Sequence, residues 1–97
     1  MAIVVFMQWK GVTGEQYDAL RTLVNWENEA PEGGIFHVAA IAEDGLRITD
    51  LWESVETYER FIENRLMPGV QHLGIPGEPD VEVYPVHRLF TPAFEPA

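Results

Sequence analysis

A tight turn between two strand-like segments constrains the fold more than any other feature of the chain. Residues 35–42 (IFHVAAIA) and 46–53 (LRITDLWE) are rich in the β-branched and apolar residues that favour strands. The intervening Glu43-Asp44-Gly45 has the composition of a hairpin turn. The pattern therefore predicts two adjacent antiparallel strands, around which the rest of the chain must be arranged.

One face of the second predicted strand combines a carboxylate with large apolar side chains. Because side chains alternate along a strand, Ile48, Asp50 and Trp52 share a face. An acid among apolar neighbours needs a specific environment. Two interpretations stay open: Asp50 belongs to a solvated face or a structural hydrogen bond, or it lies in a ligand cavity.

The remaining elements follow from apolar spacing and from capping and turn residues. Thr13 and Gln16 form a capping-box pattern before the first predicted helix, Ser54 is a cap for the second, and Pro68-Gly69 is expected to end it. The Gly- and Pro-rich residues 69–80 predict an ordered loop or lid over apolar residues, in which one extra helical turn can form. In chain order the strands and helices are expected at residues 2–9, 14–28, 35–42, 46–53, 55–67 and 81–90.

This order predicts an α+β domain of the ferredoxin-like βαββαβ type, a four-stranded antiparallel sheet with two helices on one face. The other face would be bare, and Ile48, Asp50 and Trp52 are expected on it. Such an apolar face is unfavourable in water, so a second copy of the chain is expected to cover it.

The chain is acidic and has no cysteine. Its 97 residues suit a single domain, expected over residues 1–92, with a flexible tail at 93–97 that is loose or docks through Phe94. A net charge of -10 with scattered cations argues against nucleic acid and anionic membranes as partners, and no apolar run approaches the roughly 20 residues that span a bilayer. The absence of cysteine excludes disulfides and thiolate metal sites, and no basic leader precedes the first strand, so a cytoplasmic protein is expected.

The chain resembles the dimeric α+β barrel superfamily, and within it the antibiotic biosynthesis monooxygenase-like (ABM-like) group. The resemblance rests on element order, on length and on the passage Leu51-Trp52-Glu53-Ser54, and it extends from Ile3 to Phe90. It implies a homodimer whose sheets close into a barrel, with a pocket in each protomer between the sheet and the helices or loops.

The superfamily's activities are diverse. They include cofactor-free oxygenation of polycyclic aromatics, polyketide cyclisation, lactone isomerisation, and haem binding or breakdown, so the fold does not choose among them. The chain lacks the Asn and His pair of the haem-degrading members and the His-rich first strand of the stress-responsive members. The resemblance therefore favours activity without a cofactor.

His37 is the leading candidate for proton transfer. A two- or four-residue turn would place it opposite Trp52 or Asp50 on a shared face, whereas a three-residue turn with Gly45 as a bulge would point it to the other face. Paired with Asp50, the imidazole would be fixed in one tautomer and made more basic. The alternative is a core histidine that is satisfied by one hydrogen bond.

Five further residues complete the candidate site. Trp52 and Trp9 are expected to form flat walls of a cavity, although either can equally be a core residue. Tyr84 and His87 alternate on the last predicted strand, so at most one of them faces a given cavity; His87 is the second candidate proton carrier. His72 lies where a lid would close, or is simply exposed.

The sequence thus supports two hypotheses. The first is a small homodimeric enzyme that acts on an apolar aromatic or polyketide-like molecule by proton transfer, as a cofactor-independent monooxygenase or cyclase. His37 would be the base, Asp50 would orient it, and Trp52 would be a wall. No metal is expected, because the histidines have no local ligand spacing. The second is a non-catalytic barrel that binds a ligand or serves assembly, with these residues as packing.

Overall fold

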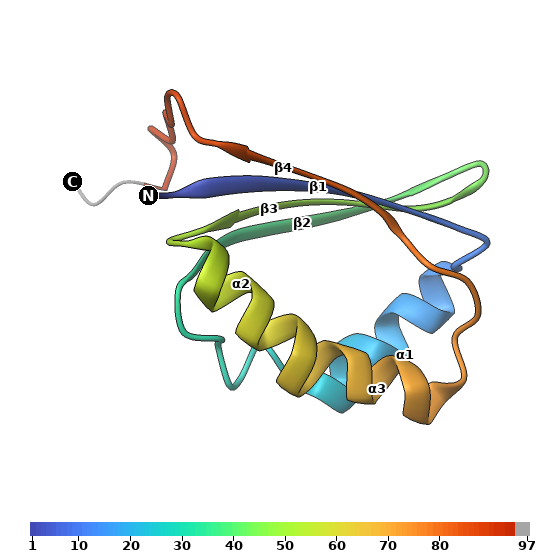
Figure 1. The fold of residues 1–97 in the computed structure, drawn as a ribbon. Coiled ribbons are helices and arrows are strands. Elements are labelled where there is room, and N and C mark those ends of the chain that lie inside the picture. Colours follow the sequence, from blue (N-terminus) through green and yellow to red (C-terminus); the bar gives the residue numbers. More distant parts are fainter. Residues whose placement is uncertain (95–97) are drawn as a thin grey trace.

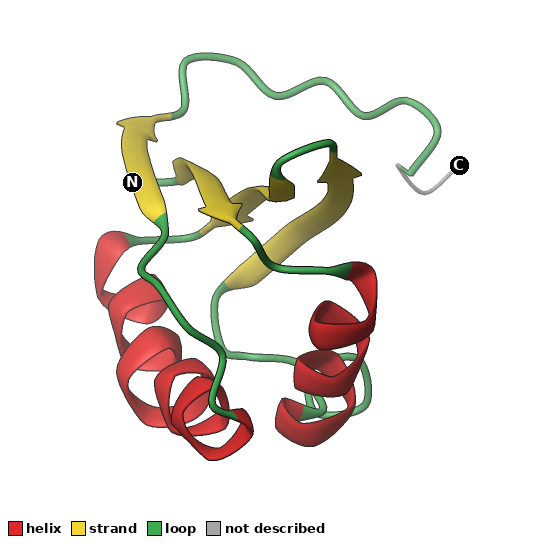
Figure 2. Ribbon diagram, turned by 90° about the vertical axis from the view of Figure 1, so that its right-hand side faces the viewer, coloured by secondary structure: helices red, strands yellow, loops and turns green. Residues whose placement is uncertain are grey.

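The computed structural model describes residues 1–94 and shows one antiparallel sheet with helices on one face (Figures 1 and 2). The elements are β1 (Ile3–Lys10), α1 (Gly14–Val24), β2 (Gly34–Ala42), β3 (Gly45–Trp52), α2 (Val55–Phe61), the π-helical turn η1 (Ile62–Leu66), α3 (Met67–Leu73) and β4 (Asp80–Pro85). The sheet order is β2-β3-β1-β4. The predicted ferredoxin-like α+β class is confirmed. None of the helices within the described residues is long and apolar enough to cross a membrane.

The β2–β3 hairpin has a two-residue loop. Ala42 pairs with Gly45, which leaves only Glu43 and Asp44 in the turn, and this register places His37 opposite Asp50. Gly45 has a φ of 144°, and a Cβ added there would lie 2.3 Å from the backbone oxygen of Trp9. A glycine is therefore required where the hairpin passes the end of β1.

The first helix begins as predicted and ends four residues early. Thr13 accepts a hydrogen bond from the Gln16 backbone, and the Gln16 side chain accepts one in return from the Thr13 backbone, which completes the capping box. Asn25 then adopts a left-handed conformation (φ 63°) and donates its backbone N–H to the Arg21 carbonyl. Asparagine tolerates this conformation, so α1 stops at Val24 and not at residue 28.

The second helix does not end at Pro68-Gly69. The π-helical turn η1 precedes Pro68, with the Met67 backbone N–H bonded to the Ile62 carbonyl, and the wider turn gives the proline ring room that a regular α-helix lacks. Gly69 then allows α3 to approach α1, because a Cβ there would lie 2.8 Å from Cγ2 of Val24. Residues 69–73 are helical, so the extra helical turn left open for the predicted loop is present, and it continues directly from the second helix.

After α3 the chain forms a loop and then the last strand, which is shorter than predicted. The loop after α3 covers Trp9, whose indole N–H donates to the Pro76 carbonyl at 3.1 Å. β4 ends at Pro85 and not at residue 90, after which Val86 bonds to Ala2 and the chain leaves the sheet. Of the predicted tail, Phe94 packs against Phe36 with ring centroids 6.3 Å apart, and residues 95–97 lie outside the described part.

The face that carries Asp50 is covered by helices, contrary to the prediction. In β1 the buried residues pair with the same face of β3: Ile3 with Trp52, Val5 with Asp50. Both helical segments lie on this side of the sheet (Figure 1). Alternation shows which residues share a face but not which face the helices cover, and this left the side of Asp50 undetermined. The bare face carries other residues, among them Phe6 and Val38.

Gly45→Ala should destabilise the protein more than Gly11→Ala. Both glycines have positive φ, but nothing lies within 4 Å of a Cβ at Gly11, whereas a Cβ at Gly45 meets backbone atoms that cannot move aside. We expect Gly45→Ala to lose about 2 kcal/mol more free energy of unfolding than Gly11→Ala. Urea unfolding followed by tryptophan fluorescence measures both, and equal losses would contradict the close approach of β1 and the hairpin.

Candidate functional site

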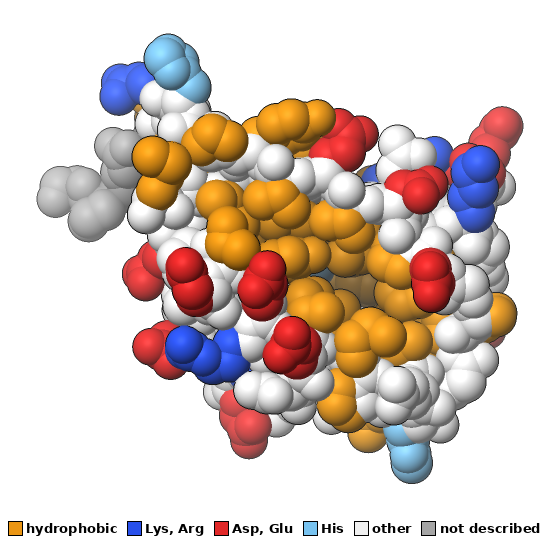
Figure 3. All heavy atoms as spheres, in the orientation of Figure 1, with side chains coloured by type: hydrophobic (Ala, Val, Ile, Leu, Met, Phe, Trp, Pro, Cys, Tyr) orange, Lys and Arg blue, Asp and Glu red, His pale blue; other side chains and the backbone are white. Residues whose placement is uncertain are grey.

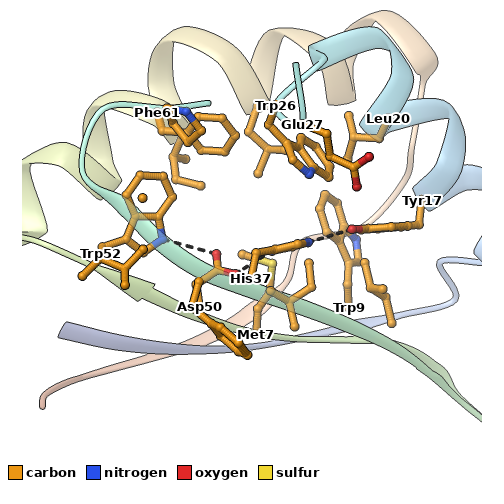
Figure 4. A pocket seen from close by; sticks show the side chains of 18 residues that line it. Met7, Trp9, Tyr17, Leu20, Trp26, Glu27, His37, Asp50, Trp52 and Phe61 are labelled. Atoms are coloured by element: carbon orange, nitrogen blue, oxygen red, sulfur yellow. Dashed lines mark hydrogen bonds and ion pairs between the residues drawn. The ribbon is translucent and has the colours of Figure 1, made fainter. Parts of the chain in front are cut away.

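A cavity of about 270 Å³ lies between the inner face of the sheet and the helices. Figure 3 shows hydrophobic side chains gathered around a recess at this place, and Figure 4 shows the side chains that line it. Aromatic rings come from strands, helices and the segment after α1. The aromatic residues among the lining are Trp9, Tyr17, Trp26, Phe36, Trp52 and Phe61. The cavity is therefore suited to a flat, apolar molecule.

His37 and Asp50 form a hydrogen-bonded pair on the sheet side of this cavity. His37 Nδ1 lies 2.6 Å from Asp50 Oδ1, and the side chains are 32% and 13% exposed. The other carboxylate oxygen accepts the indole N–H of Trp52 at 3.3 Å. Because a carboxylate only accepts hydrogen bonds, the proton between the pair is assigned to Nδ1, which leaves Nε2 as the acceptor of the neutral ring.

Tyr17 of α1 reaches across the cavity to Nε2 of His37. Its hydroxyl lies 2.7 Å from that nitrogen, and the planes of the two rings are nearly parallel, inclined by 9° with centroids 6.0 Å apart (Figure 4). Trp26 packs against both rings, with centroids 5.8 Å from Tyr17 and 5.5 Å from His37. Since Nε2 accepts, Tyr17 is the donor.

Burial raises the pKa of Tyr17, and the nearby Glu27 carboxylate adds to the increase. The hydroxyl therefore keeps its proton at neutral pH. The side chains that line the cavity include two carboxylates, Glu27 and Asp50, and no Lys or Arg. Its electrostatic field disfavours an anionic ligand. Within residues 1–94 no group of three or more His, Cys, Asp or Glu side chains is arranged to hold a metal ion.

Comparison with solved structures identifies the fold. The protein NE2512 of Nitrosomonas europaea, of unknown function, is 13% identical with a TM-score of 0.70, covering 94% of each chain. SnoaB of Streptomyces nogalater, a cofactor-independent oxygenase, is 10% identical with a TM-score of 0.61, covering 94% of this chain and 95% of SnoaB. A candidate antibiotic biosynthesis monooxygenase from Chloroflexus aurantiacus is 18% identical with a TM-score of 0.60, covering 93% of this chain and 98% of the other.

The chain has the ABM-like fold. The likeness of fold inferred from the sequence is thereby confirmed. No family model and no curated protein sequence matches the chain. At these identities the likeness concerns the ABM-like fold alone, so the chemistry has to be argued from the residues of the cavity.

The structure brings together four of the predicted site residues. His37, Asp50, Trp52 and Trp9 all line the cavity of this ABM-like domain. The turn of two residues, one of the alternatives left open, sets the register that pairs His37 with Asp50. Whether any of the four acts in catalysis or binding stays a prediction.

The other three predicted site residues do not line the cavity. His72 lies exposed on α3, whose Gly69 and Val70 face inward. Tyr84 lies on the bare face of the sheet, where it packs against Phe6 and donates to Glu82. His87 is exposed beyond β4, because the strand ends before it. A ligand inside the cavity would therefore not contact His72, Tyr84 or His87.

Tyr17, Trp26 and Glu27 line the cavity, and the sequence analysis gave none of them a role in the site. The available signal was the phenol itself, because a tyrosine on an apolar helix face needs a partner for its hydroxyl. No local pattern shows that this partner is His37, since the contact depends on how α1 crosses β2.

Proposed function

We propose that this protein is a homodimeric enzyme that binds an uncharged aromatic or polyketide-like molecule and promotes proton-transfer chemistry, as a cofactor-independent monooxygenase or cyclase. The observation that carries the proposal is the hydrogen-bonded His37–Asp50 pair, 2.6 Å apart, in an aromatic cavity. The pair supplies a base whose conjugate acid is stabilised by a carboxylate, and Trp52 supplies a wall.

Removal of a proton from a phenol, or from carbon beside a carbonyl, leaves a ligand anion. In oxygenation, this anion reduces dioxygen; a CH₂ group becomes a carbonyl, one oxygen atom enters the product and the other leaves as water. In cyclisation, the anion attacks a carbonyl of the same chain. The ABM-like fold supports the first route by its likeness to SnoaB, described as a cofactor-independent oxygenase.

The cavity also limits the ligand. Its volume of about 270 Å³ exceeds the roughly 150 Å³ of an engineered cavity that holds benzene, and this suits about two fused rings. A larger polyketide would extend through the opening. The two carboxylates and the absence of Lys and Arg among the lining residues favour a ligand that enters uncharged.

The homodimer is supported by the bare face of the sheet. Exposed apolar side chains there include Phe6 (43% exposed), Val38 (48%) and Tyr84 (49%), on three different strands. A second copy that packs on this face would remove them from water. The cavity lies on the opposite side of the sheet, so each protomer would keep its own site.

A neutral two-ring ligand should bind more tightly than an anion of the same size. We expect 2-naphthol to bind at least about tenfold more tightly than 2-naphthoate at pH 7, because the naphthoate charge meets Glu27 and Asp50. All three tryptophans of the chain line the cavity, so their fluorescence reports binding. Glu27→Gln should reduce the difference in affinity between 2-naphthol and 2-naphthoate. Equal affinity of the two ligands in the unmodified protein would contradict the proposed ligand class.

His37→Ala should remove turnover and preserve the fold. With anthrone in air, whose CH₂ group would become the second carbonyl of anthraquinone, we expect oxygen uptake above the uncatalysed rate to fall by roughly 10² to 10⁴-fold, the usual contribution of a general base. His72→Ala is the matched control, because His72 is exposed and outside the cavity. Equal rates for the unmodified protein and His37→Ala would refute the role of His37. No uptake by the unmodified protein would favour a non-catalytic barrel.

Phe6→Glu should convert a dimer into a monomer. The charge would stand among the exposed apolar side chains on the bare face of the sheet, whereas Leu23→Glu on α1 places the same charge at a similarly exposed site (46%) on the helical side. Sedimentation velocity at micromolar concentration distinguishes the two states. A monomer in the unmodified protein, or a dimer that persists in Phe6→Glu, would count against packing through this face.

A further inference from the structure

Both ring nitrogens of His37 are already engaged. Asp50 accepts from Nδ1 at 2.6 Å, and Tyr17 donates to Nε2 at 2.7 Å. A general base needs a free lone pair within reach of the proton that it removes. His37 therefore has no free nitrogen for a ligand while Tyr17 is in place.

Tyr17 is held in this position by its neighbours. Its hydroxyl is hydrogen-bonded to His37, and the Trp26 ring packs against the rings of both Tyr17 and His37. Rotation of the phenol away from His37 would lose these contacts and the hydrogen bond together. A ligand that needed to displace Tyr17 would bind more weakly, because part of its binding free energy would be spent on breaking these contacts and this hydrogen bond.

The hydroxyl of Tyr17 can accept a hydrogen bond as well as donate one. It lies on the lining of the cavity, and its donated proton goes to His37 (Figure 4). A phenol oxygen keeps its lone pairs when it donates. A ligand hydroxyl in the cavity can therefore donate to Tyr17 without any rearrangement of the His37–Asp50 pair.

We propose that Tyr17 is the catalytic residue that receives the ligand's proton and passes it to His37. The O–H bond of the ligand breaks as an O–H bond forms on Tyr17. The original O–H bond of Tyr17 breaks as an N–H bond forms at Nε2 of His37. The products are a ligand anion, a neutral tyrosine and an imidazolium beside the Asp50 carboxylate. No group is oxidised or reduced in this step.

The raised pKa of Tyr17 agrees with this role. A hydroxyl that stays protonated cannot store the proton, but it can transfer one in while another leaves, so His37 is the final acceptor. Burial is the main cause of the increase. The charged groups that act on the hydroxyl, in decreasing order, are Glu27, Arg21, Asp50 and Asp18, of which only Arg21 lowers the pKa.

The inference rests on the proposed function for its ligand class, but its test needs neither oxygen nor turnover. The probe is 7-hydroxycoumarin, a neutral two-ring phenol whose anion absorbs at a longer wavelength. We expect the bound phenol to titrate about one pH unit or more below the free phenol in the unmodified protein. Tyr17→Phe and His37→Ala should each abolish this shift. Tyr58→Phe, which removes a hydroxyl outside the cavity lining, should preserve it.

A second measurement distinguishes loss of proton transfer through Tyr17 (the relay) from disruption of the His37–Asp50 pair by the substitution. Nitrogen-15 NMR of the free Tyr17→Phe protein should show His37 still protonated at Nδ1, with Nε2 shifted toward an unbonded acceptor. If bound phenol then ionises as readily as in the unmodified protein, His37 is the direct base and the inference is wrong. Binding without ionisation in the unmodified protein would also overturn the inference. Failure of the phenol to bind at all would instead refute the proposed function, and the relay with it.

Discussion

The carboxylate of Asp50 sets the arrangement of the site. It is 13% exposed on the inner face of the sheet, opposite Val5, where an ionised acid without partners would be strongly disfavoured. Its two oxygens take the N–H groups of His37 and Trp52. These bonds fix the tautomer of the imidazole and the position of the indole, and the imidazole in turn receives the hydroxyl of Tyr17. One partly buried carboxylate thus orders side chains from β2, β3 and α1.

Local patterns in the sequence predicted the elements and part of the site. The hairpin turn, the capping box and the alternation along β3 each depend on residues a few positions apart, and the structure shows all three. The residues that escaped prediction depend on long-range geometry. Tyr17 meets His37 only because α1 crosses β2, and Asp50 faces the helices only because the buried side of β1 does. The helix boundaries at Asn25 and Pro68 moved because a left-handed asparagine and a π-helical turn are tolerated there.

The inner face of the sheet forms the cavity, whereas the outer face presents exposed apolar side chains. The inner face builds the cavity with α1, α2 and η1, through residues such as Phe61 and Leu66. The outer face presents exposed apolar side chains and contributes little to the cavity. Closure of a barrel by two sheets, as the resemblance implies, would therefore not be needed to form the cavity. All the residues that line the cavity come from a single chain, and a second copy on the outer face would affect the cavity only through the intervening sheet.

Charge conservation explains how an apolar cavity could support the proposed proton transfer. In that proposal the site holds a neutral ligand, a neutral imidazole and the Asp50 carboxylate before transfer; afterwards it would hold a ligand anion, an imidazolium and the same carboxylate. The net charge is unchanged, so the desolvation cost of a new isolated ion is avoided. A ligand that entered as an anion would add a charge beside Asp50 without a cation to offset it. The pair of His37 and Asp50 would therefore account both for the proposed proton transfer and for the proposed neutrality of the ligand.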